Sequence, residues 1–225
     1  MRLPSPEHLW ERHETLVLNV FMIAIIKLRE ETNLPEDEPT LNELLYTLVR
    51  DSWCKLLQSE KPIWSLSRNT ENPPRTTNEI GQKWTRKRPD FSWTLSDPLE
   101  RNSEKAIKDY VIECKRLRPG TSRNFIHEYV VKGIVRFLTK EHKYGNGTVS
   151  GAMIGYIQGM KHEEALEQVN AVIVTTKEFV IPVIEFTHNR QIKNRIRKGN
   201  HTLSRKEVNP SIFDLRHIWM EVTNC

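Results

Sequence analysis

One stretch, residues 109–117, restricts the fold more than any other, because a short apolar run leads directly into an acid and a base. It reads Asp-Tyr-Val-Ile-Glu-Cys-Lys-Arg-Leu. Side chains alternate between the two faces of a β-strand, so we expect Glu113 and Lys115 on one face and Cys114 on the other. The stretch therefore predicts a buried strand that presents a carboxylate and an amine together.

A second strand is predicted upstream, where Pro89 precedes a run of alternating residues. Its two faces are apolar and polar respectively: Phe91, Trp93 and Leu95, then Asp90, Ser92 and Thr94. Proline is tolerated at the first position of a strand, so it does not contradict the period-two pattern. We expect Asp90 on the polar face, at the beginning of this strand.

The remaining periodic segments alternate between helical and strand-like patterns. The patterns predict helices over 7–31, 40–57, 124–140 and 161–175, and β-structure over 149–158, 179–186 and 215–222. Residues 59–88 are polar and rich in proline and predict a loop with at most one short strand. This order predicts an α/β (α+β) fold, with a mixed central β-sheet flanked by helices.

The start of the second helix gives Glu43 two interpretations. Thr40 is a favoured N-cap residue, and Glu43 follows three residues later, as in a capping box. Glu43 would then stabilise the helix end by roughly 1 kcal/mol. Alternatively, its carboxylate belongs to a metal site.

Length and composition indicate a single folded domain of 225 residues, with 37% hydrophobic and 28% charged residues. We divide it into an N-terminal helical region (1–39), a catalytic core (40–158) and a C-terminal extension with a basic segment (159–225). The apolar run 16–26 is shorter than the roughly 20 residues that span a bilayer, and acids precede it, so we expect neither membrane nor signal peptide. Three cysteines without metal-ligand spacing predict a reducing cytoplasm.

The charge is distributed unevenly. Residues 1–60 hold 6 Lys/Arg and 11 Asp/Glu, whereas the remainder holds 28 and 18. A basic surface suits a polyanion such as nucleic acid, although a soluble basic protein without such a partner has the same composition. The most basic segment, 188–206, is interpreted either as a solvated loop or as a flap that contacts phosphates.

Asp90 and Glu113, at neighbouring strand ends, predict a site for a hard divalent cation. Mg²⁺ is usually held by one or two carboxylates together with waters and phosphates, and the Cys114 carbonyl is a further oxygen donor. Lys115, on the same face, would position or deprotonate a water, its pKa lowered by burial. The Cys114 thiol should face the core and be inert. The alternative is a cross-strand salt-bridge ladder.

Pro-Asp at 89–90, followed by Glu-Cys-Lys at 113–115, resembles the PD-(D/E)xK nuclease superfamily. The resemblance implies a restriction endonuclease-like fold, whose core of helix, three antiparallel strands, helix and strand corresponds to residues 40–158. It also implies that an upstream helical glutamate joins the metal site, and Glu43 matches that position. A second Glu-x-Lys, at 141–143, has neither the strand nor the Pro-Asp. The Gln-x-x-x-Tyr motif of the recombination-nuclease branch is absent.

The function that this resemblance implies is a Mg²⁺- or Mn²⁺-dependent nuclease acting on DNA, in bacterial defence against foreign DNA. Asp90, Glu113 and Glu43 would bind the metal, and Lys115 would act on the nucleophile. Cleavage of both strands suggests a homodimer, and sequence specificity would come from the chain's own loops or from a partner protein. The candidate phosphate contacts are basic: Lys132, Arg136, Arg190, Lys193, Arg195, Arg197 and Lys198. Two alternatives are a non-catalytic nucleic-acid-binding or assembly subunit of the same fold and a phosphohydrolase of small nucleotides.

Overall fold

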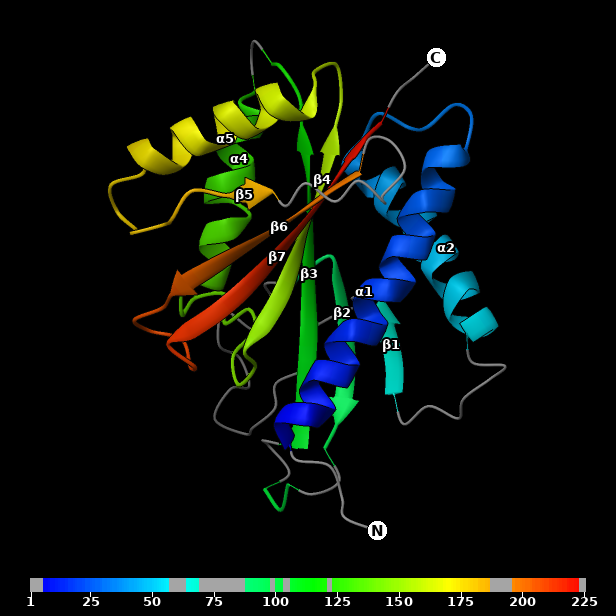
Figure 1. Cartoon of the computed structure of the whole chain (residues 1–225), viewed down its shortest axis with the longest axis vertical. Coiled ribbons are helices and arrows are strands. Elements are labelled where there is room, and N and C mark those ends of the chain that lie inside the picture. Colours follow the sequence, from blue (N-terminus) through cyan, green and yellow to red (C-terminus); the bar gives the residue numbers. More distant parts are fainter. Residues whose placement is uncertain are drawn as a thin grey trace.

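The computed structural model describes residues 6–56, 64–68, 88–97, 100–102, 106–120, 123–186 and 196–222. Over these ranges, helices cover both faces of a central seven-stranded sheet (Figure 1). The strand order is β1-β2-β3-β4-β7-β6-β5. The predicted α+β fold with a mixed sheet flanked by helices is therefore confirmed. Among these residues, none of the helices has the length and apolar character required to cross a membrane.

The sheet combines an antiparallel and a parallel part. Its strands are β1 (Trp64–Arg68), β2 (Phe91–Ser96), β3 (Ile107–Leu117), β4 (Ser150–Ile157), β5 (Glu185–Phe186), β6 (Ile196–Ser204) and β7 (Ile212–Glu221). β1, β2 and β3 pair antiparallel, while β4 lies parallel to both β3 and β7. The carboxyl ends of β3, β4 and β7 therefore lie at one edge of the sheet, which is where α/β proteins commonly bind ligands.

Two long helices cover one face of the sheet. They are α1 (Pro6–Glu30) and α2 (Glu38–Leu56), close to the predicted ranges. Their apolar sides share one core with the inward side chains of β2 and β3, and the Phe21 ring meets that of Phe91 edge-on, with centroids 5.3 Å apart. This core contains Ile112 and Cys114, as the alternation in residues 109–117 predicted.

The predicted N-terminus of α2 is wrong. The helix begins at Glu38 rather than after Thr40, and Asp37 Oδ1 accepts a hydrogen bond of 2.9 Å from the Thr40 backbone N–H. Asp37 therefore caps the helix, and the capping box of Thr40 and Glu43 does not form. Pro39 falls in the first turn, where its missing N–H has no helical partner in any case.

The opposite face of the sheet carries α4 (Phe125–Val131), the 3₁₀ helix η3 (Ile134–Phe137) and α5 (His162–Thr175). The predicted single helix over 124–140 is wrong, because the chain breaks at Gly133. A Cβ atom at Gly133 would lie 2.3 Å from the Tyr129 backbone oxygen and 2.5 Å from Met153 Cε. Glycine at position 133 thus permits close packing against β4.

Two predictions in the C-terminal extension also need correction. β-structure expected over 179–186 is limited to Glu185–Phe186. The loop or flap expected over 188–206 is wrong for Ile196–Ser204, which form β6. Arg205 does not contact solvent either: it is buried, and its guanidinium donates to the backbone oxygens of Pro210 and Tyr144.

Candidate functional site

The candidate site forms where β3 continues beyond the first residue of β2. Phe91 pairs with Ile112, so Asp90 lies beside the part of β3 that extends further. The Cys114 backbone N–H donates a 2.7 Å hydrogen bond to Asp90 Oδ2. This bond fixes the Asp90 carboxylate next to Glu113 and Lys115, as the two strand patterns predicted.

The Lys115 ammonium lies at the centre of a group of oxygen atoms. Its Nζ is 2.8 Å from Glu113 Oε1 and 3.8 Å from Asp90 Oδ2. It also donates to the backbone oxygen of Cys114 at 2.6 Å. The three oxygen donors predicted for a cation therefore surround one cation in the structure, and that cation is the lysine side chain.

A further carboxylate belongs to this group, and it is Glu38 rather than Glu43. Glu38 Oε1 accepts from Lys115 Nζ at 2.9 Å, and Oε2 accepts from the Arg116 backbone N–H at 3.2 Å. Glu43 is exposed on α2, and five residues of helix turn it roughly 140° away from Glu38. Sequence analysis missed one signal: Asp37 is a favoured N-cap residue and Pro39 suits the first turn, so together they indicate a helix that begins at Glu38.

Glu113 is the most buried carboxylate of the site, with 1% of its surface exposed. Arg136 Nη1, from η3, donates to its Oε1, so Arg136 contacts the site directly instead of lying outside it. Glu113 Oε2 is buried without a hydrogen-bond partner among the described residues. Burial and the neighbouring Asp90 carboxylate raise the pKa of Glu113 to about 8, against the opposing effect of Lys115 and Arg136.

The prediction that burial lowers the pKa of Lys115 is wrong. Burial alone acts in that direction, but the carboxylates of Glu113, Asp90 and Glu38 outweigh it and raise the pKa above its ordinary value. Lys115 is thus a protonated cation in this arrangement, and it cannot accept a proton. Burial also raises the pKa of the Cys114 thiol, which faces the opposite core as expected.

The oxygen donors suit a hard divalent cation, although the described residues contain no group of three or more His, Cys, Asp or Glu that is arranged to hold a metal. Mg²⁺ is bound by carboxylate and carbonyl oxygens, which are the donors that converge on Lys115 Nζ. The unpartnered Oε2 of Glu113 is a buried acceptor that a cation would satisfy. The donor atoms are therefore of the kind that suits such an ion, and in the structure they surround the Lys115 ammonium.

The other predicted phosphate contacts are dispersed. Lys132, which follows α4, pairs with Glu128 at 2.8 Å and is exposed. Arg197 and Lys198 lie on β6, three strand positions from β3, or roughly 14 Å across the sheet. The remaining three, Arg190, Lys193 and Arg195, lie outside the described residues.

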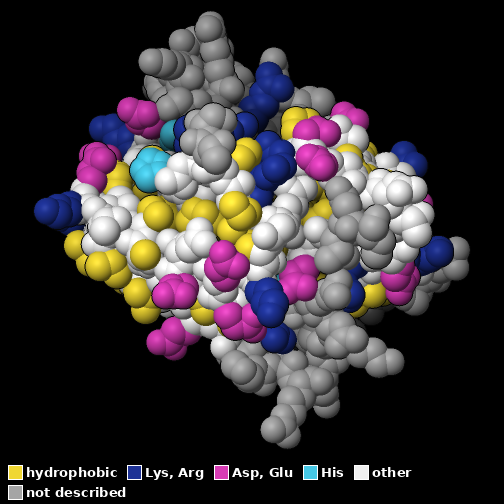
Figure 2. Space-filling model, turned by 90° about the horizontal axis from the view of Figure 1, so that it is seen from above, with side chains coloured by type: hydrophobic (Ala, Val, Ile, Leu, Met, Phe, Trp, Pro, Cys, Tyr) yellow, Lys and Arg dark blue, Asp and Glu magenta, His cyan; other side chains and the backbone are white. Residues whose placement is uncertain are grey.

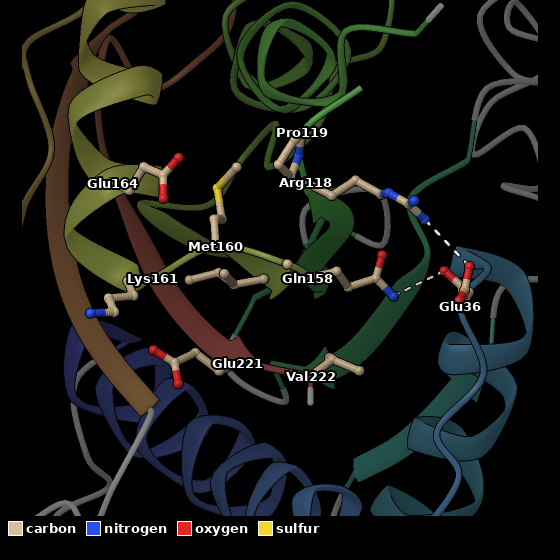
Figure 3. Close-up of a pocket in the computed structure, with 11 residues that line it drawn as sticks. Glu36, Arg118, Pro119, Gln158, Met160, Lys161, Glu164, Glu221 and Val222 are labelled. Atoms are coloured by element: carbon tan, nitrogen blue, oxygen red, sulfur yellow. Dashed lines mark hydrogen bonds and ion pairs between the residues drawn. The ribbon is translucent and has the colours of Figure 1, made fainter. Parts of the chain in front are cut away.

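A pocket of about 1020 Å³ adjoins the site at the carboxyl ends of β3, β4 and β7 (Figure 3). Arg118 and Gln158 both extend from its wall towards Glu36, with an ion pair of 3.5 Å and a hydrogen bond of 3.0 Å to the Glu36 carbonyl. The end of the molecule seen in Figure 2 mixes acidic and basic side chains. The charges of this end are therefore not separated into faces of one sign.

Comparisons with known proteins add nothing to the geometry of the site. No protein family, curated protein or solved structure matches this chain.

Proposed function

We propose that this chain is a metal-dependent nuclease that hydrolyses the phosphodiester bonds of DNA with Mg²⁺ or Mn²⁺. One observation carries the proposal: the carboxylates of Glu38, Asp90 and Glu113 and the Cys114 carbonyl converge on a single cationic atom, Lys115 Nζ. Oxygen donors gathered in this way are the ligands of a hard divalent cation.

Each residue of the site has a definite part in the proposed reaction. Asp90, Glu113 and Glu38 would hold the ion, which supplies charge stabilisation at a phosphoryl oxygen and a lowered pKa for a water. Arg136 orients Glu113 through its hydrogen bond. Lys115 would offset the negative charge of the phosphate with its own positive charge.

The resemblance in sequence supports the same proposal. The order α2, β1 to β3, α4 and β4 agrees with the core that the PD-(D/E)xK resemblance implies, with Glu38 as the upstream helical glutamate. Two further predictions follow from the resemblance alone: a role in bacterial defence and a dimer with two active sites for cutting both strands.

A second candidate is a nucleic-acid-binding subunit without catalysis. It is favoured by the Lys115 ammonium, which already pairs with Glu38 and Glu113, and by the lack of an arranged metal cluster among the described residues. In that case the buried ion pairs would only connect α2 to β3.

Cleavage assays separate the two candidates. Wild type, Asp90→Asn and Lys115→Met are incubated with plasmid and with single-stranded DNA and RNA, in Mg²⁺, in Mn²⁺ and in EDTA. We expect metal-dependent cleavage by wild type and a loss of at least about 100-fold in both variants, since each lacks a charge that acts on the transition state.

Mn²⁺ binding, followed by calorimetry, distinguishes the roles of the two residues. Asp90→Asn should lose affinity, because it lacks an ionised ligand, whereas Lys115→Met should still bind the ion while failing to cleave. Equal cleavage by all three proteins would refute the catalytic assignment. DNA binding by a wild type that cleaves none of these substrates would favour the second candidate.

A further inference from the structure

Three arginine side chains gather around one aromatic ring immediately after the candidate site. Their guanidinium carbons lie 4.6, 5.5 and 4.9 Å from the centre of the Phe125 ring, for Arg116, Arg118 and Arg123 respectively. Each contact with the ring is attractive, but three like charges at such short range repel one another. An arrangement of this kind is stabilised when anions lie close to it.

The acids around this arginine cluster are shared with neighbouring lysines. Glu128 pairs with Arg123 and also with Lys132, at 2.5 and 2.8 Å. Glu36 lies 3.5 Å from Arg118. Asp37 and Glu38 also act on Arg116 and Arg123, but Glu38 is shared with Lys115, as Glu128 is with Lys132.

Arg116 retains hydrogen-bonding capacity that these contacts do not use. Its Nη1 donates to the backbone oxygen of Glu36 at 2.9 Å, while its Nε is buried and has no partner among the described residues. A buried donor without an acceptor costs free energy. An anion that drew the side chain outwards would satisfy this donor.

The arginine cluster is continuous with the candidate site. A single carboxylate, that of Glu38, accepts from the Arg116 backbone N–H with one oxygen and from Lys115 Nζ with the other. The turn after β3 fixes the geometry, because a Cβ atom at Gly120 would lie 2.2 Å from the Arg123 backbone oxygen. The backbone that carries the cluster is thereby joined to the candidate site through Glu38.

We propose that Arg116, Arg118 and Arg123 bind the phosphates of the nucleic-acid strand that neighbour the scissile phosphate. The inference rests on the proposed function for the position of that phosphate. Guanidinium groups hold phosphates through paired N–H donors, and neutralising phosphates releases counterions. Continuity with the cation site favours a nucleic-acid strand over an anionic membrane surface, to which the same charges would respond.

The test measures binding without cleavage. Wild type and the double variant Arg118→Gln/Arg123→Gln are titrated with fluorescent single-stranded and duplex DNA in EDTA, at several salt concentrations. We expect the double variant to bind at least about 10-fold more weakly, with the slope of log K against log salt reduced by roughly two.

Arg50→Gln is the matched control, because Arg50 is an exposed arginine twelve residues along α2 from Glu38, or about 18 Å. It should bind DNA as wild type does. Glu128→Gln gives a change that misfolding cannot imitate: removal of the acid that neutralises Arg123 and Lys132 should tighten DNA binding several-fold.

The possible outcomes are distinct. The proposal would be overturned if the double variant bound DNA as wild type does, or if the double variant and Arg50→Gln lost affinity equally. It would also be overturned if wild type bound anionic lipid vesicles but not DNA. A wild type that binds through these arginines yet never cleaves would retain this surface and refute only the nuclease function. A wild type that cleaves, with the KM of the double variant unaltered, would refute only the surface.

Discussion

The replacement of Glu38 by Gln, compared with the same replacement at Glu43, tests which glutamate of α2 belongs to the site. Glu38 accepts hydrogen bonds from Lys115 Nζ at 2.9 Å and from the Arg116 backbone N–H at 3.2 Å. Glu43 is exposed, and five residues of helix separate it from Glu38 by roughly 140° around α2. Both variants remove one negative charge from α2. The difference between their free energies of unfolding therefore reports the local contacts of Glu38.

The structure sets the expected size of the effect. A hydrogen bond to a charged group contributes about 1.5–3 kcal/mol and is roughly twice as strong as a neutral one. Glutamine retains a neutral acceptor, so each of the two bonds should lose about 1 kcal/mol. We expect Glu38→Gln to lower the free energy of unfolding by about 2 kcal/mol, equivalent to a melting temperature about 4–8 °C lower for a chain of this size. Glu43→Gln should stay within about 0.5 kcal/mol of wild type.

Urea unfolding followed by circular dichroism measures the change in the free energy of unfolding for each variant. Mn²⁺ calorimetry on the same proteins tests whether Glu38 is a metal ligand. Glu38→Gln should bind Mn²⁺ more weakly, by about 10-fold, while Glu43→Gln should match wild type. Equal behaviour of the two variants, in stability and in affinity, would refute the assignment of Glu38 to the site.

Two further predictions concern stability. Arg205→Ala should lower the free energy of unfolding by about 3–5 kcal/mol, because it leaves buried carbonyl oxygens without donors and removes a contact with the Phe213 ring. Lys206 is the exposed neighbour, and Lys206→Ala should change this free energy by less than about 0.5 kcal/mol. Urea titration measures both changes. Burial lowers the pKa of three histidines: His13, His201 and His217. Their neutral forms are favoured on folding, so their contribution is complete above the unfolded value of 6.5 and is lost as pH falls below it. Glu113 acts in the opposite sense between pH 4.5 and 8, since its folded pKa is raised to about 8. Asp90, whose pKa is also raised by burial, acts in the same sense as Glu113. Acidification from pH 7.5 to 5 should therefore lower the free energy of unfolding by less than the roughly 6 kcal/mol that three histidines kept neutral would give, and a larger loss would contradict this account.

Local patterns in the sequence were sufficient for the strands of the site. Alternation in residues 109–117 and 91–95 correctly separated the side chains that face the α1 and α2 core from Glu113 and Lys115. The register that brings Asp90 to Cys114 depends on pairing between segments 24 residues apart, but two strong strands with a short link leave few arrangements.

The errors arose where tertiary contacts override local preference. The periodic pattern of 124–140 continues through Gly133, yet α4 ends at Val131, and position 133 lies too close to the Tyr129 carbonyl and to Met153 for a larger residue. Arg205 looked like an exposed charge, because sequence alone cannot show that carbonyl oxygens of a distant turn surround it. The raised pKa of Lys115 depends on the summed charge of Glu113, Asp90 and Glu38, of which Glu38 lies 77 residues away in the sequence.

The structure of the protein with Mn²⁺ bound, determined by anomalous diffraction, tests the central claim most directly. The account predicts a manganese peak among the carboxylates of Glu38, Asp90 and Glu113, with the Lys115 ammonium displaced from its present contacts at 2.8 and 2.9 Å. A saturated crystal that has no peak there, and in which Lys115 still contacts Glu38 and Glu113, would contradict it.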